Sequence, residues 1–296
     1  STTDTLINLG ITQKTRWNEL WLSFAAIFIQ SPGIKNKYGI FEPNTEKVKF
    51  DPVTHVLQRA GVENIMNPFD RQALEVALTL KDKFGAKVTM LTMGLPQAAD
   101  ILKDAISMGA DDAILLSDRV LGGSDTLATS MSLAAAIKKI GNYDLILCGK
   151  QAVDGDTAQV GPEIAEHLGL PQITSALSTE YKDGKFIVRR ENEEASITLA
   201  CAAPLLVTVE KAGKEPRFAS IKGKMKARKA AIPEWGIADL GLTEDQIGLP
   251  GSPTKVRKAF APAPPEISGE IINVEDMDEA VDMLMQKLIS AEVLSR

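Results

Sequence analysis

The chain contains few of the residues that build metal centres and covalent catalytic sites. Among its 296 residues there are only 2 cysteines and 2 histidines. Cys148 and Cys201 each lie inside an apolar run, which indicates buried, reduced thiols. Together with His55 and His167 they cannot build a metal cluster. We therefore expect no metal site, and the reduced thiols favour a cytoplasmic location.

A basic surplus and a membrane-spanning run are also missing. The formal net charge is -6 and the isoelectric point is about 5.2, which argues against a nucleic-acid partner because phosphates attract basic surfaces. The apolar run at 20–30 (LWLSFAAIFIQ) is far shorter than the roughly 20 residues that cross a membrane. No basic start precedes it and no small-residue cleavage site follows, so we expect neither a secretion signal nor membrane insertion. We interpret this run as the first, central strand of a parallel sheet.

Apolar strand patterns alternate with helical patterns over the first two-thirds of the chain. The predicted elements are a strand at 22–30, a hairpin of 47–50 with 56–59, a helix at 68–83 capped by Asn67, a strand at 87–92, a helix at 97–108, a strand at 113–116, a helix at 126–140 capped by Asp125, and a strand after Asp144. This order predicts an α/β protein with a doubly wound, mostly parallel sheet of the Rossmann-like, nucleotide-binding kind. After Pro171, a β-hairpin extension at 179–186 turning at Asp183-Gly184 and strands at 197–200 and 205–209 are expected.

The most informative segment runs from 144 to 171. Its apolar residues 145–148 have the length of a fully buried strand, which ends at Gly149 in a polar loop before a helical pattern begins. A buried strand, a loop and a helix N-terminus together form the geometry that binds phosphates and nucleotides in open α/β sheets. The sequence therefore predicts a nucleotide site at the carboxyl ends of the parallel strands.

The predicted loop carries two carboxylates beside the expected place of a phosphate. Because carboxylates repel phosphates, we expect Asp154 and Asp156 to cap the helix, close Asx turns or accept hydrogen bonds from ribose hydroxyls. The phosphate donors would be backbone amides and side chains such as Thr157 and Gln159. Gly155 and the glycine at the strand end fit both a tight turn and a close approach of the backbone to a ligand.

Motifs of hydrolytic or nucleophilic catalysis are absent. The sequence has no Gly-x-Ser-x-Gly elbow, no Walker lysine and no Ser–His–Asp set. A nucleotide loop without a catalytic group fits a protein whose cofactor performs the chemistry, while the protein binds, orients and tunes that cofactor.

Residues 149–162 (GKQAVDGDTAQVGP) resemble the signature of the electron-transferring flavoprotein beta subunit. The resemblance continues through 67–70 (NPFD), 93–96 (MGLP), 117–129 and 215–218 (EPRF), and it covers the chain roughly from Val48 to the C-terminus. Before that point the chain departs from the family, because Ile29 stands where the family has a lysine and 1–21 matches no family segment.

The strand ends and the resemblance together assign a set of residues to the cofactor. Thr126 and Thr129 would either cap their helix or hold flavin phosphate or ribityl oxygens. Met93 would be either a core residue or a contact to flavin or adenine. The full set is Asn67, Pro68, Phe69, Asp70, Met93, Gly94, Asp125, Thr126, Thr129, Cys148, Gly149, Lys150, Gln151, Ala152, Asp154, Gly155, Asp156, Thr157, Gln159 and Val160.

The family that the chain resembles has two types. In one type the beta subunit carries AMP, and the only flavin sits with the alpha subunit. In the other, typical of anaerobic bacteria, the beta subunit holds its own FAD, accepts electrons from NADH and splits them between two acceptors. Residues 122–129 and 155–162 resemble the second type, which implies FAD, NADH, ferredoxin or flavodoxin, and an acyl-CoA-type dehydrogenase. A non-bifurcating carrier with AMP is the alternative, and a nucleotide-binding stress-type module is a further one.

The regions after the nucleotide-binding domain are expected to contact partners. Residues 211–229 are basic and predict a loop. For any single lysine in it, the simplest interpretation is a solvated surface position. The resemblance implies that Pro216, Arg217 and Phe218 contact the dehydrogenase. A proline-rich spacer leads to an amphipathic helix at 275–291, which could fold back or dock on the alpha subunit through Leu284 and Leu288. The expected divisions are an unassigned segment 1–21, a nucleotide-binding domain 22–210, a partner-recognition loop 211–230, and a linker with C-terminal arm 231–296.

Overall fold

The computed structural model describes residues 6–8, 23–29, 49–50, 57–58, 66–152, 157–192, 194–255, 271–272, 274 and 276–293, the first four of these ranges by their backbone only. The chain divides into two compact units, 1–259 and 260–296. The first unit is an α/β structure, and the second carries the helix α6 (Met277–Ser290). The proline-rich spacer at 261–265 lies outside the described residues.

The described strands of the first unit form a 10-stranded sheet with the order β1-β10-β9-β8-β11-β7-β2-β5-β6-β12. Its strands are β1 (Leu6–Asn8), β2 (Ser23–Ile29), β5 (Lys87–Met93), β6 (Asp112–Leu116), β7 (Leu145–Gly149), β8 (Gln172–Lys182), β9 (Lys185–Glu191), β10 (Ser196–Cys201), β11 (Leu205–Val209) and β12 (Glu234–Trp235). Every neighbouring pair from β8 through to β12 in this order is parallel, while β9 is antiparallel to both of its neighbours. The predicted mostly parallel sheet is confirmed.

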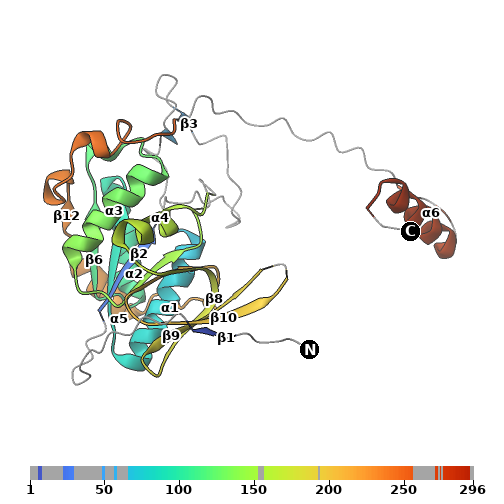
Figure 1. Cartoon of the computed structure of the whole chain (residues 1–296), viewed down its shortest axis with the longest axis horizontal. Helices are drawn as coiled ribbons and strands as arrows, with labels where there is room; N and C mark the ends of the chain where they lie inside the picture. Colours follow the sequence, from blue (N-terminus) through green and yellow to red (C-terminus); the bar gives the residue numbers. More distant parts are fainter. Residues whose placement is uncertain are drawn as a thin grey trace. The chain divides into compact units, whose positions relative to one another are not determined.

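Strand β2 lies at the centre of this sheet, between β7 and β5, as predicted for the apolar run at 22–30. It is not the first strand, because β1 precedes it in the chain and pairs with β10 at the far edge. The predicted hairpin is present as β3 (Lys49–Phe50) and β4 (Leu57–Gln58), which pair antiparallel outside the main sheet. Figure 1 shows β8, β9 and β10 projecting as an extension at the lower right of the unit.

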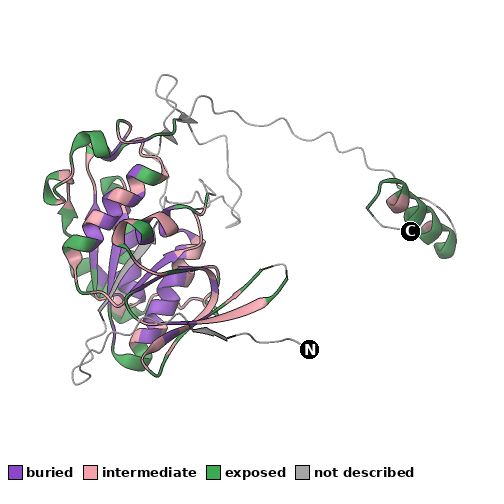
Figure 2. Ribbon diagram, in the orientation of Figure 1, coloured by how far each residue is buried: buried purple, intermediate pink, exposed green. Residues whose placement is uncertain are grey.

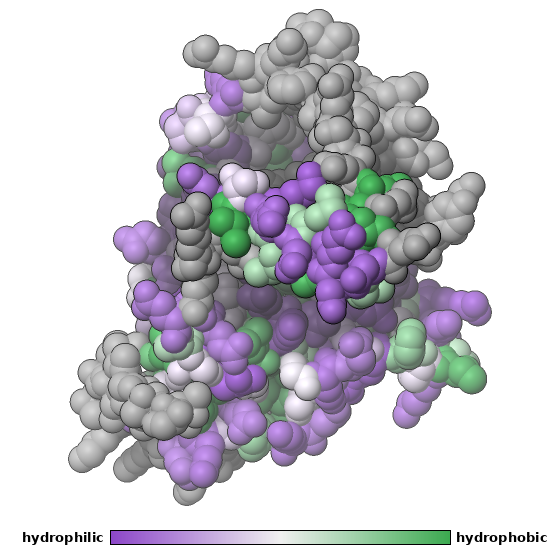
Figure 3. Space-filling view, turned by 90° about the vertical axis from the view of Figure 1, so that its right-hand side faces the viewer, coloured by the Kyte–Doolittle hydropathy of each residue, from purple (hydrophilic) through white to green (hydrophobic). Residues whose placement is uncertain are grey.

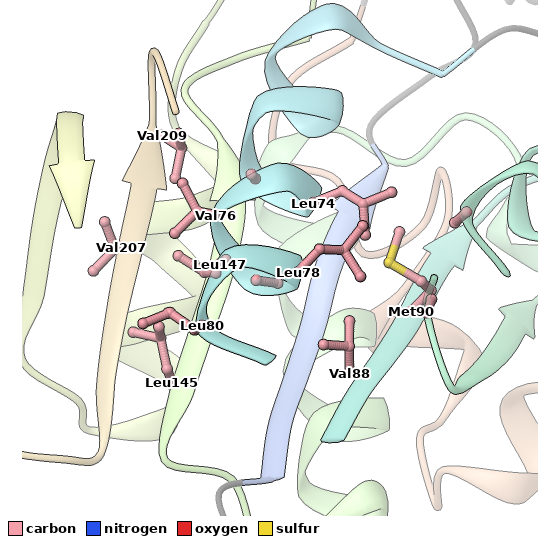
Figure 4. Packing of buried hydrophobic residues seen from close by; sticks show 14 of the residues in the cluster. Leu74, Val76, Leu78, Leu80, Val88, Met90, Leu145, Leu147, Val207 and Val209 are labelled. Carbon is pink, nitrogen blue, oxygen red and sulfur yellow. The ribbon is translucent and has the colours of Figure 1, made fainter. Parts of the chain in front are cut away.

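Helices cover both faces of the parallel strands. Along β7 the side chains alternate between faces: Leu145 and Leu147 pack in one cluster with α1 and α2, whereas Ile146 and Cys148 pack in a second with α3 and α4. The helices are α1 (Pro68–Phe84), α2 (Ala99–Met108), α3 (Thr126–Ile140), α4 (Val160–Leu168) and α5 (Ile221–Lys229). Figure 4 shows α1 side chains packed with those of β5, β7 and β11, and Figure 2 shows that burial concentrates on these facing sides.

Local signals explain where several elements begin and turn. The Asp125 carboxylate accepts a hydrogen bond from the Ala128 amide at 3.1 Å, so α3 begins at Thr126 as predicted. The hairpin of β8 and β9 turns at Asp183 and Gly184, whose φ angles of 50° and 79° are both positive, as a type I′ turn requires.

The loop predicted for 211–229 is wrong in its second half, because 221–229 form helix α5. The Ser220 hydroxyl accepts a hydrogen bond from the Gly223 amide at 2.9 Å and caps this helix. A Cβ on Gly223 would lie 2.0 Å from the Ser107 carbonyl oxygen, so only glycine permits this approach of α5 to the end of α2. Lys226 donates to the Ala110 carbonyl oxygen at 3.0 Å and further joins the two helices.

Residues 234–252 also pack on the α/β unit, although the sequence analysis assigned 231–296 to a linker and arm. Strand β12 pairs with β6, and the Ile247 side chain is fully buried. Gly248 has a φ of +58°, and a Cβ there would lie 2.0 Å from the Val120 carbonyl oxygen. Its apolar residues are interrupted by glycines and acidic residues and follow neither the strand nor the helix period, so its sequence gave no core signal.

The contact at Gly223 leads to a first prediction. Gly223→Ala should lower the free energy of unfolding by about 1–3 kcal/mol, because α5 must move away from α2 to admit the methyl group. Lys222→Ala is the matched control, since Lys222 is exposed on the same helix. Urea unfolding followed by circular dichroism measures both variants. Equal stabilities of the two would contradict the close approach.

Candidate functional site

The carboxyl edge of the parallel strands gathers the segments that the sequence analysis assigned to a nucleotide. Strand β5 ends at Met93, β7 at Gly149 and β11 at Val209. Helix α4 is the next element after β7, and α3 follows β6 after the short 3-10 helix η2 (Arg119–Leu121), so the N-termini of both helices lie at the same edge. Hydrogen bonds between the start of α1 and the end of β7 place α1 there too. This edge is the candidate site.

A buried pair of side chains joins α1 to the loop after β7. Asp70, 1% exposed, accepts a hydrogen bond from the Gly149 amide at 2.8 Å through one carboxylate oxygen. Its other oxygen accepts from the Asn67 side-chain amide at 2.9 Å, and that amide also donates to the Gln151 carbonyl oxygen at 2.8 Å. Asn67 therefore stands at the N-cap of α1 without capping it, which corrects the predicted role of its side chain.

Gly149 is required by this arrangement. A Cβ at Gly149 would lie 2.7 Å from the Asp70 backbone nitrogen and 2.7 Å from the Phe69 Cβ, both closer than real side chains come. The φ angle of Gly149 does not demand glycine, so the reason is contact with α1 alone. The structure thus gives a reason for this glycine that the sequence analysis did not offer, close approach to helix α1, and the expected approach to a ligand stays a prediction.

The neighbouring residues of the loop are partly tied to the sheet. The Lys150 amide donates to the Val209 carbonyl oxygen at 2.8 Å, and its ammonium group pairs with Glu210 at 3.3 Å. Cys148 is 2% exposed and its side chain lies in the core beside α4. Burial, together with the nearby Asp70 carboxylate, raises the pKa of the Cys148 thiol far above its usual value, so the group stays protonated. The side chain of Cys148 is thus a core residue.

Helices α3 and α4 meet at the same edge through a short contact. The Thr126 hydroxyl donates to one Glu163 carboxylate oxygen at 3.1 Å, while the other oxygen of Glu163 is buried without a hydrogen-bond partner among the described residues. Asp125, besides capping α3, accepts from the Thr254 amide at 2.9 Å and from its hydroxyl at 2.8 Å. The Asp125 amide donates to the Ser252 hydroxyl at 2.8 Å. Sequence reasoning missed Ser252 and Thr254, because only the fold brings 248–254 to the start of α3.

The structure leaves polar groups at this edge that a nucleotide could use. The Asn67 side-chain oxygen is buried, yet it has no hydrogen-bond partner among the described residues. Thr157 and Gln159 are exposed immediately before α4, whose first amides have no partners within the helix. Asp154, Gly155 and Asp156 lie outside the described residues, so their assignment stays a prediction. Met93, Gly94 and Thr129 are half-buried at the strand and helix ends, as expected for residues lining the edge.

The predicted partner contacts behave differently from one another. The Arg217 side chain is only 29% exposed, because its guanidinium donates to Glu75 at 2.9 and 3.0 Å and to Asp82 at 2.7 Å. The Phe218 ring, by contrast, is 88% exposed. On the face drawn in Figure 3, hydrophilic side chains predominate and hydrophobic ones occur in small groups. Among the large apolar side chains of the described residues, Phe218 has the highest exposed fraction.

Helix α6 has the amphipathic pattern expected of an arm. The Asp276 carboxylate accepts a hydrogen bond from the Asp278 amide at 2.9 Å and begins the helix. None of the described α6 residues is buried within the second unit, and Leu284 is 48% exposed while Leu288 is half-buried. The apolar side of α6 thus lacks a partner within the described part of its own unit.

A parallel sheet with helix N-termini at its carboxyl edge is the architecture in which open α/β proteins bind nucleotides. Residues 54–240 match the family model "Electron transfer flavoprotein domain". The chain belongs to the electron transfer flavoprotein family, and its relatives place it among the beta subunits. It is therefore an electron-transfer flavoprotein component, which implies an alpha subunit and redox partners.

Several relatives carry this assignment. The chain is 52% identical over 261 residues to the electron transfer flavoprotein subunit beta of Megasphaera elsdenii, covering 85% of this chain and 96% of the relative. It is 43% identical over 253 residues to the caffeyl-CoA reductase-Etf complex subunit CarD of Acetobacterium woodii, covering 85% and 96%. It is 43% identical over 229 residues to the protein FixA of Azorhizobium caulinodans, covering 75% and 82%. None of the helices in the described residues combines the length and hydrophobicity that crossing a bilayer requires.

The Glu75 contacts lead to a prediction about acid stability. Burial alone raises the pKa of Glu75, but the hydrogen bonds from Arg217 and Lys214 outweigh burial, and the pKa falls from 4.5 to about 2. Because the folded-state pKa lies below the unfolded one, this stabilisation is complete above about pH 4.5 and is lost as the pH falls towards about 2. A shift of this size corresponds to about 3 kcal/mol.

The measurement is urea unfolding of the wild type and of Glu75→Gln at several values between about pH 6 and about pH 2.5. The wild type should be the more stable protein at the upper end, and the difference should shrink as the pH falls. Two parallel stability curves would show that Glu75 does not contribute through its charge.

Proposed function

We propose that this chain is the beta subunit of a bifurcating electron transfer flavoprotein, with FAD bound at the carboxyl edge of its sheet. The complex would take electrons from NADH and divide them between ferredoxin or flavodoxin and, through the FAD of the alpha subunit, an acyl-CoA-type dehydrogenase. The cytoplasm is the proposed location, which the buried free thiols of Cys148 and Cys201 support.

One observation carries the cofactor part of this proposal. The loop after β7 is held by Asp70 and Asn67, and the Asn67 oxygen is a buried acceptor without a partner among the described residues. A buried polar group usually has a hydrogen-bond partner, and a nucleotide with amino or hydroxyl donors would supply one. The family is a flavoprotein family, and the resemblance of 122–129 and 155–162 to the FAD-binding type favours FAD over AMP.

The residues of this chain would bind and orient the cofactor rather than react. Amides at the start of α4, with Thr157 and Gln159 in front of it, would donate to a pyrophosphate. Asp70 would keep the loop in place beside the cofactor, because its carboxylate receives the Gly149 and Asn67 donors. The flavin, when bound, supplies the one- and two-electron chemistry. No described side chain of this edge has to exchange a proton in that role.

The cofactor prediction is tested on the native complex with its alpha subunit, which is denatured so that the released nucleotides can be identified by chromatography and mass spectrometry. Two FAD per alpha–beta pair are expected. One FAD with one AMP would instead identify a carrier of the non-bifurcating type, and ATP or no nucleotide from this chain would identify a stress-type module.

Thr157→Glu locates the site within the same experiment. A carboxylate before α4 should expel one nucleotide per pair by charge repulsion, while it favours rather than harms the helix N-terminus. Thr157→Gln has the size of the first variant without its charge and should keep the nucleotide. Full flavin content in Thr157→Glu would place the cofactor elsewhere.

A second prediction of the proposal concerns α6, which we expect to dock on the alpha subunit. The double variant Leu284→Gln and Leu288→Gln should separate the alpha and beta subunits. Each substitution removes about 1.5–3 kcal/mol of binding free energy that burial of the leucine would supply at the interface. Met283→Gln, on the opposite side of the helix by its spacing, should leave the complex intact. Light scattering after size-exclusion chromatography measures the assembly. A double variant that still elutes as an intact pair, or one that unfolds this chain by itself, would count against docking.

A further inference from the structure

The segment between β11 and α5 is attached to helix α1 mainly by charged and polar side chains, beside a small apolar contact of Ala212. We propose that Glu75 is a positioning residue for partner recognition, which holds this segment (211–218, the partner loop) so that Phe218 is presented to the partner. The inference rests on the proposed function, because it assumes that the partner loop meets a dehydrogenase. It adds a residue outside the loop that determines how well the loop binds.

Glu75 receives four hydrogen bonds from two residues of the partner loop. One carboxylate oxygen accepts from Arg217 twice, from the side-chain Nε at 2.9 Å and from the backbone amide at 3.0 Å. The other accepts from the Arg217 Nη2 at 3.0 Å and from the Lys214 ammonium at 2.8 Å. The Glu75 side chain is only 1% exposed. Its position inside the molecule therefore requires these two cations.

Detaching the partner loop from Glu75 would be costly. Opening the partner loop would break all four bonds to Glu75 at once, and hydrogen bonds between charged groups are stronger than those between neutral ones. Neighbouring α1 residues hold the loop backbone as well: Gln72 accepts from the Ala212 amide at 2.9 Å, and Arg71 donates to the Arg217 carbonyl oxygen at 3.4 Å. The partner loop is thus fixed along one side of α1.

The opposite side of the loop presents apolar groups to solvent. Phe218 is 88% exposed, and Ile221 and Met225 at the start of α5 are 83% and 58% exposed. Ile221 and Met225 are one helical turn apart and therefore share a face. Exposed basic residues surround them: Lys222, Lys224, Arg228 and Lys229. This surface fits a partner that offers an apolar pocket with acidic side chains around it.

A fixed loop improves binding because less conformational freedom is lost when the partner arrives. An aromatic side chain that is already oriented can act as an anchor, and such anchors dominate interface energies. Glu75 would supply this orientation without contacting the partner, since it is buried beneath Arg217. The same helix carries Asp70, about 7 Å from Glu75 along its axis. Helix α1 would therefore position both the nucleotide loop and the partner loop.

Glu75→Gln in the intact alpha–beta complex tests the inference, because glutamine keeps the shape but offers an amide to the Arg217 guanidinium. Limited proteolysis with trypsin, with cut sites located by mass spectrometry, should show cleavage after Lys211, Lys214 and Arg217 at least about tenfold faster than in the wild type. The KM for the partner dehydrogenase should rise about tenfold, while kcat at saturating partner and nucleotide content stay within about twofold.

Asp82→Asn is the matched control, because Asp82 also pairs with Arg217 but is 59% exposed. Exposed pairs contribute little, so its cleavage rate and KM should stay within about twofold of the wild type. Arg217→Lys is a second test variant should Glu75→Gln fail to fold, since lysine cannot reproduce the two-pronged contact. It should open the loop to trypsin in the same way.

The outcomes separate this inference from the proposed function. Unchanged cleavage in Glu75→Gln, or faster cleavage with an unchanged KM while Phe218→Ala raises the KM, would overturn the positioning role alone. If Glu75→Gln is cleaved faster but neither Glu75→Gln nor Phe218→Ala changes the KM, the partner role of the loop is overturned, and this inference with it. Nucleotide content reports on the cofactor proposal independently of either result.

Discussion

Burial of two carboxylates on one helix is the constraint on which the rest of the molecule depends. Asp70 and Glu75 are each about 1% exposed in α1, and each is satisfied by groups that lie far away in the chain. A buried anion without donors would destabilise the fold, so the loop after β7 and the partner loop must both remain in contact with α1. The leucine and valine side chains of the same helix anchor it on the sheet (Figure 4). Apolar packing thus places the helix, and its acidic residues place the loops.

Local sequence signals predicted the fold well because they do not depend on distant residues. Asp125 begins α3, Pro68 opens α1 and Asp183-Gly184 turns the hairpin, each through its own backbone preferences. The alternation of strand and helix patterns was sufficient for the doubly wound sheet. Helix α5 was missed because its buried contacts come from Gly223 and Ala227, and small residues leave no apolar stripe in the sequence.

At the site, several polar side chains bond to groups far away in the chain instead of taking the role that their local sequence predicts. Asn67 has the side chain of a helix cap, yet its amide is taken by a carbonyl group 84 residues further along. Arg217 has the chemistry of an exposed partner contact, yet a carboxylate 142 residues away binds its guanidinium. Phe218 is 88% exposed, and its predicted contact with a partner stays a prediction. Charged and amide side chains are therefore the residues whose roles the fold decides.

The partner loop joins two elements that are themselves immobilised, since β11 lies inside the sheet and α5 is held to α2 at Gly223. A loop with both ends anchored keeps its backbone position when its exposed side chains change. Its outward side chains can be replaced without refolding the sheet, because none of them contributes to the core. Under the proposed partner role, a few substitutions in this loop would change the choice of redox partner while the cofactor chemistry stays the same.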